Sequence, residues 1–106
     1  MRSLIYSHHW NDENGNPAGG NTYGNGFAIA WQNGPLGRGI DRKVPNGAFV
    51  EDIIFSAINR LEFYQNSKFA CEENAEALKA LRFASEWLDS RTLKRDKRGV
   101  EGTHAI

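Results

Sequence analysis

The sequence has one cysteine, Cys71, among 106 residues, so no disulfide can form within the chain. There is no CxxC pair and no Cys/His spacing of the kind that holds zinc, which excludes the common structural zinc motifs. A lone thiol fits a reducing cytosol. We therefore expect neither a metal nor a disulfide framework to hold the fold together.

An excess of one charge is also missing, because 13 basic residues balance 13 acidic ones. This excludes binding of DNA or RNA polymers through a global positive field. No apolar run approaches the roughly 20 residues of a membrane-spanning helix, and the one at the N-terminus is too short for a signal peptide. We expect a cytoplasmic protein without a membrane partner.

Length and composition favour a single α+β domain of residues 1–106. Its parts are a β part over residues 1–44, a helical hairpin over 45–98 and a C-terminal tail over 99–106. Strand-like runs at Leu4–Trp10 and Phe27–Gln32 predict a small antiparallel hairpin or sheet. The Gly- and Asn-rich segment Asn11–Asn25 between them is predicted to be a long loop, whose role stays open.

Apolar residues recur at helical spacing in the second half of the chain. The first helix is expected over about Ala48–Gln65 with Asn46 as its N-cap, and the second begins within Phe69–Glu73. A short link makes the pair a long antiparallel αα-hairpin packed with the β part. The inner stripe of the second helix is predicted to comprise Cys71, Ala75, Leu78, Leu81, Ser85 and Leu88.

Four aromatic residues fall outside the two inner stripes. Large apolar side chains on outer faces are hard to leave in water, so they favour a symmetric homo-oligomer. The alternative is that the β part covers them. The four residues are Phe49, Phe63, Phe83 and Trp87.

Five of the eight residues from Arg91 to Arg98 are basic. Arg91 and Arg95 are four residues apart on one helix face, and two neighbouring guanidiniums suit a diphosphate. The alternative is a solvated helix end whose cations complement the helix dipole. Asn74 lies on the inner side, where its amide either packs against the other helix or pairs with an adenine edge. Arg38, between two glycines, is a turn residue or a ligand contact.

Nothing in the sequence argues for an enzyme. His8 and His9 point to opposite faces of a regular strand and cannot share one metal ion. The Gly-rich segment before Phe27 is neither a Walker A loop nor a dinucleotide fingerprint. No Ser/His/Asp or Cys/His arrangement and no paired carboxylates near a histidine are visible. We expect no catalytic residues, no metal and no cofactor.

Taken together, several segments resemble the first Thoeris anti-defence protein family of phages. The helical hairpin and the Gly-Val-Glu-Gly-Thr-His tail are also similar to the second anti-CBASS protein family. The resemblance covers Phe27–His104. The segments are Ala30-Trp-Gln-Asn-Gly-Pro-Leu-Gly-Arg-Gly39, Pro45-Asn-Gly-Ala-Phe-Val-Glu-Asp52, Arg60-Leu-Glu-Phe-Tyr-Gln65, Lys68-Phe-Ala-Cys-Glu-Glu-Asn74, and Arg91-Thr92 followed by Arg98-Gly-Val-Glu-Gly-Thr-His104.

The resemblance implies a protein that sequesters glycocyclic ADP-ribose, the signal that bacterial TIR enzymes make, without cleaving it. It implies action in the cytoplasm of the infected host, and dimers with pockets at the subunit interface or hexamers built as trimers of dimers. Phe63 resembles the family's stacking aromatic, with Tyr64 as the alternative. The family's adenine-contacting amide, phosphate-binding arginines and loop arginine correspond to Asn74, Arg91, Arg95 and Arg38, with Arg42 close to the last.

Three alternatives remain open. Relatives also bind cyclic di- and trinucleotides of CBASS systems at a second site formed in the hexamer, and the shared tail over residues 99–104 is compatible with this. An enzyme that degrades an ADP-ribose-like nucleotide would use His104 or Glu101 as acid–base. A purely structural helical-hairpin oligomer would bind no small molecule.

Overall fold

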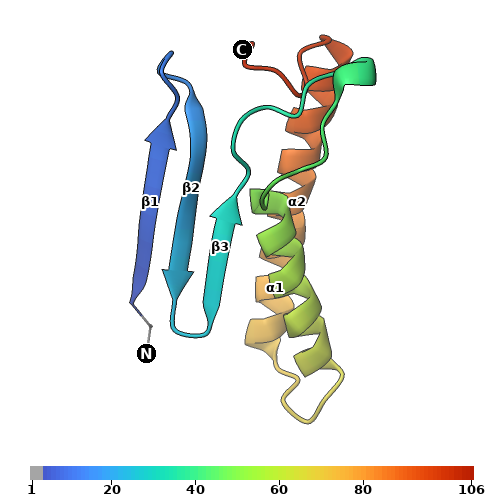
Figure 1. Ribbon diagram of the computed structural model, residues 1–106. Coiled ribbons are helices and arrows are strands. Elements are labelled where there is room, and N and C mark those ends of the chain that lie inside the picture. Colours follow the sequence, from blue (N-terminus) through green and yellow to red (C-terminus); the bar gives the residue numbers. More distant parts are fainter. Residues whose placement is uncertain (1–3) are drawn as a thin grey trace. The chain divides into compact units, whose positions relative to one another are not determined.

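The computed structural model describes residues 4–106 (Figure 1). Three strands come first, β1 (Ile5–Asn11), β2 (Pro17–Gly24) and β3 (Phe27–Trp31), followed by a 3-10 turn at Gly39–Asp41. Two helices complete the chain, α1 (Val50–Gln65) and α2 (Glu72–Lys97). The predicted α+β class, a small antiparallel sheet followed by an αα-hairpin, is confirmed. The residues group into two compact units, the chain up to Phe49 together with Gly99–Ile106, and Val50–Arg98.

The sheet is an antiparallel meander of order β1-β2-β3. Tyr6 pairs with Tyr23, and Tyr23 pairs with Ala28 on the other side. The prediction of one long loop over Asn11–Asn25 is therefore wrong, because β2 occupies most of that segment. Two short turns remain, on either side of β2.

Glycine makes β2 possible where the sequence suggested a loop. Gly19 and Gly20 are both buried. A Cβ on Gly19 would come within 2.7 Å of the Trp10 indole, and one on Gly20 within 2.6 Å of the carbonyl oxygen of His8. The two glycines thus let the neighbouring strand and its large side chains approach closely.

The chain after β3 returns alongside it. The amide of Ala48 donates to the carbonyl of Ala30 at 2.7 Å, and the amide of Gln32 donates to the carbonyl of Ala48 at 2.9 Å. Asn46 bonds the main chain of Asn33 through both ends of its amide, at 2.8 and 3.0 Å. The prediction that Asn46 caps a helix is therefore wrong. Its side chain ties two loop segments together, and α1 begins only at Val50.

The helical hairpin has a thin core. Ile58 on α1 and Leu78 and Ser85 on α2 are buried. Figure 1 shows the two helices running antiparallel. Leu78, Ser85 and the half-buried Leu81 and Leu88 confirm most of the predicted inner stripe of α2. Cys71 and Ala75 are exposed, so the stripe does not extend to the first turn.

Large aromatic side chains stand on the outer surface of this hairpin. Phe63, Phe83 and Trp87 are 61–64% exposed, which confirms that they lie off the inner stripes, and Phe49 before α1 is half-buried. The rings of Phe83 and Trp87 contact each other edge-to-face with centroids 6.2 Å apart. No helix in residues 4–106 combines the length and apolarity that crossing a membrane requires.

Candidate functional site

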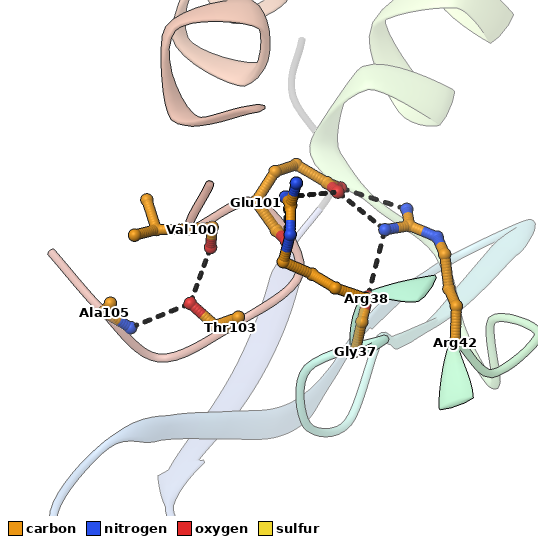
Figure 2. A network of polar contacts seen from close by, with 7 residues as sticks. All are labelled: Gly37, Arg38, Arg42, Val100, Glu101, Thr103 and Ala105. Atoms are coloured by element: carbon orange, nitrogen blue, oxygen red, sulfur yellow. Dashed lines mark hydrogen bonds and ion pairs between the residues drawn. The ribbon is translucent and has the colours of Figure 1, made fainter. Parts of the chain in front are cut away.

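The C-terminal tail folds back onto the loop that carries Arg38 (Figure 2). The amide of Gly37 donates to the carbonyl of Gly102 at 2.8 Å. Arg42 donates to both carboxylate oxygens of Glu101, at 2.6 and 3.0 Å, and to the carbonyl of Gly37 at 3.1 Å. We call this set, Gly37, Arg38, Arg42, Glu101 and Gly102, the loop–tail contact. A two-pronged arginine–carboxylate pair is a strong and directional interaction, so it fixes the loop to the tail.

The loop–tail contact separates the roles of the two loop arginines. Arg42 is engaged with the Glu101 side chain. Arg38 instead donates to the main-chain carbonyl of Glu101 at 2.9 Å, with its nitrogen 4.0 Å from that carboxylate. Both arginines are exposed. Both arginines therefore fix the loop to the tail, and the role of Arg38 as a ligand contact stays a prediction.

A second tail contact is made at the turn between β1 and β2. The carboxylate of Asp12 accepts hydrogen bonds from the amides of Asn14 and Asn16 at 2.9 and 3.0 Å. His104 lies beside this turn, 3.9 Å from the Asp12 carboxylate and 3.4 Å from the Asn16 amide. The hydrogen bond from the amide of Asn16, with a smaller contribution from His104, lowers the pKa of Asp12.

This lowered pKa predicts a pH-dependent stability. A carboxyl group whose pKa is lowered on folding stabilises the protein above its unfolded pKa, near 3.9, and loses that contribution as pH falls through the folded value. We expect Asp12→Ala to lower the denaturation midpoint at pH 7, and the gap from wild type to close below about pH 4. Urea titrations across this range measure it. A gap that stays constant would show that Asp12 acts without its charge.

Phe63 stands near the end of α1 with its ring exposed, while the neighbouring Tyr64 is half-buried. Their ring centroids are 5.9 Å apart with planes tilted by 60°. The guanidinium of Arg60 lies over both rings, 5.1 Å from the centroid of Phe63 and 4.9 Å from that of Tyr64. Of the two rings, Phe63 has the accessible surface that stacking on a base requires.

Asn74, in the first turns of α2, is half-buried. Its amide nitrogen donates to the carbonyl of Phe69 at 3.3 Å, in the connector between the helices. This hydrogen bond to the main chain orients the side-chain amide of Asn74. Phe63 and Asn74 therefore flank the same end of the helical hairpin, where the connector joins α1 to α2.

Arg91 and Arg95 lie near the other end of α2, one turn apart on one face. Arg91 is exposed and Arg95 is half-buried. At about 1.5 Å of rise per residue, Asn74 and Arg91 are separated by about 25 Å along the helix axis. A single hairpin thus places Phe63 and Asn74 at one end and Arg91 and Arg95 at the other, farther apart than one mononucleotide reaches.

Two contacts at these surfaces escaped the sequence reasoning, namely that of Arg60 with two aromatic rings and that of Arg42 with Glu101. Arg60 is three and four residues before Phe63 and Tyr64, a spacing that does predict contact on a helix. Arg42 and Glu101 are 59 residues apart, and no local pattern connects them. Among residues 4–106, no cluster of three or more His, Cys, Asp or Glu side chains could hold a metal ion.

Comparison with known proteins identifies the class. Residues 25–93 match the family described as "Acb2/Tad1, hairpin domain". This match covers more than half of the chain, and the chain belongs to that family. It is also similar to "Thoeris anti-defense 1" of Bacillus phage SBSphiJ7, with 52% identity over 59 residues. The similar segment is 56% of this chain and 42% of that relative, so the chain matches less than half of the relative's length.

Proposed function

We propose that this chain is a phage anti-Thoeris protein that binds glycocyclic ADP-ribose signals and holds them without cleavage. Membership of the hairpin family and the similarity to a Thoeris anti-defence protein support the biological role. The observation that supports the ligand is the complementary set of side chains on the helical hairpin. An exposed ring and an oriented amide suit an adenine base, and two guanidiniums in consecutive turns suit a diphosphate.

The pocket is shared between two copies of the chain. Because the base-binding pair and the phosphate-binding pair lie about 25 Å apart on one hairpin, one nucleotide cannot contact both within a subunit. An antiparallel pair of hairpins places Phe63 and Asn74 of one subunit opposite Arg91 and Arg95 of the other. The exposed aromatic faces of α1 and α2 supply the apolar surface that such an interface buries.

Sequestration fits the polar chemistry better than hydrolysis. Glu101, the tail residue with a carboxylate side chain, accepts two hydrogen bonds from Arg42. That pairing stabilises the carboxylate in place and does not prepare it to exchange protons with a substrate. We therefore expect stoichiometric binding, with the ligand recovered chemically unchanged after the complex is denatured by heat.

The shared pocket makes a direct prediction for mixed dimers. One subunit carries Phe63→Ala and Asn74→Ala, and the other carries Arg91→Ala and Arg95→Ala. Each homodimer has two incomplete pockets, whereas the heterodimer has one intact pocket and one that lacks all four side chains. Co-expression with two affinity tags isolates the heterodimer for calorimetric titration with glycocyclic ADP-ribose.

We expect one ligand per heterodimer at close to wild-type affinity, and weak binding to either homodimer. A heterodimer that binds as weakly as the homodimers would contradict a pocket shared in this way. Size-exclusion chromatography of the three species, run beside the titration, checks that the substitutions leave the dimer intact.

A further inference from the structure

The side chain of Arg60 occupies an unusual position on the helical hairpin. It projects from α1 one turn before two consecutive aromatic residues, and its guanidinium is nearly equidistant from the Phe63 and Tyr64 rings, at 5.1 and 4.9 Å. A planar guanidinium stacks well on aromatic faces. Of the two rings that the guanidinium contacts, that of Tyr64 is half-buried and that of Phe63 is exposed.

Resting on these contacts and on the function proposed above, we propose that Arg60 is a positioning residue of the nucleotide site. Its guanidinium, anchored on Tyr64, holds the ring of Phe63 so that the opposite face of that ring receives the adenine base. Arg60 acts through Phe63, and the base does not touch it.

The physical reason is the cost of ordering an exposed ring. A surface phenylalanine exchanges between rotamers, and a ligand that stacks on it must stop that exchange, at about 0.5–1.5 kcal/mol per side chain, which corresponds to about two- to tenfold in affinity. A cation already seated on one face of the ring removes part of that cost before the ligand arrives. Phe83 and Trp87, by comparison, contact each other and have no cation over them among the described contacts.

The test is a double-mutant cycle with glycocyclic ADP-ribose as the titrant. The proteins are wild type, Arg60→Ala, Phe63→Ala and the double variant. We expect Arg60→Ala to weaken binding about two- to tenfold in the wild-type background. In the Phe63→Ala background it should have no further effect, because the ring through which it acts is absent.

Lys79→Ala is the matched control. It removes one positive charge from an exposed ion pair with Glu76, on the same helical hairpin but without a ring contact, and it should leave the affinity unchanged. An equal loss from Arg60→Ala in both backgrounds would overturn the inference, since Arg60 would then contact the ligand or the partner subunit directly. No loss in either background overturns it too.

The cycle also separates this inference from the proposed function. If the wild type binds tightly and the losses of affinity from the two substitutions add, only the role of Arg60 is refuted and the proposed function stands. Absence of binding by the wild type refutes the proposed ligand and, with it, the role of Arg60.

Discussion

Replacing both Arg91 and Arg95 with alanine is expected to reduce the affinity for glycocyclic ADP-ribose by roughly 10²- to 10⁴-fold. Each guanidinium would make a charge-assisted hydrogen bond to the diphosphate, at about 1.5–3 kcal/mol. Since about 1.4 kcal/mol corresponds to a factor of ten, two lost contacts give this range. Isothermal titration calorimetry of the double variant, with competition against wild type at the weak end, measures the effect.

Lys79 and Lys97 supply the matched control. Both lie on α2 and carry the same charge as the arginines, but at 100° per residue they share a face about 140° away from the Arg91–Arg95 pair. Lys79→Ala with Lys97→Ala makes the same change in net charge and should weaken binding by less than about fivefold, the scale of a screened surface charge. Equal losses in the two double variants would mean that the ligand responds to the general basic charge of α2, and not to a diphosphate site.

The second large effect concerns the tail. Gly102 has a φ of +81°, and a Cβ there would overlap the carbonyl oxygen of Gly37. Gly102→Ala therefore combines the cost of a left-handed conformation, about 1–2 kcal/mol, with loss of the hydrogen bond between Gly37 and Gly102. We expect the loop–tail contact to open and the amide of Gly37 to lose its protection from hydrogen exchange.

Gly99 provides a closely matched comparison three residues earlier. Its φ is +75°, but a Cβ at Gly99 meets nothing within 4 Å. Gly99→Ala thus carries only the conformational cost, about 1–2 kcal/mol at the end of α2, and should leave Gly37 protected. Equal loss of hydrogen-exchange protection at the Gly37 amide in both variants would contradict this account. The conformational cost at the glycine, and not the close approach of the loop and the tail, would then determine whether the loop–tail contact opens.

Helical periodicity predicted the hairpin because one repeating pattern specifies both the helix and its buried face. Leu78 and Ser85 are buried where that pattern places them, and Phe63 is exposed where it predicts exposure. The pattern failed at Cys71, because that residue precedes the first helical residue of α2, has an extended backbone and is exposed. Periodicity specifies a face but not the residue at which the helix begins.

The sheet was harder to predict because the residues of β2 are explained by contacts with another strand. The Gly-Gly pair of β2 has low strand propensity. It leaves room for Trp10 and for the main chain of His8, which belong to β1. The same holds for Asn46, which resembles a helix cap in sequence but bonds Asn33, 13 residues away. Contacts between distant segments, including Arg42 with Glu101, leave no local pattern to find.

If the protein sequesters its nucleotide without cleaving it, the bound ligand can be recovered intact. The protein is mixed with an equimolar amount of glycocyclic ADP-ribose, incubated at 37 °C for hours, denatured by heat, and the supernatant is analysed by chromatography and mass spectrometry. Sequestration predicts full recovery of the unchanged ligand and no free ligand before heating. Accumulation of a product over time, faster with more protein, would contradict it and show that the site turns its nucleotide over.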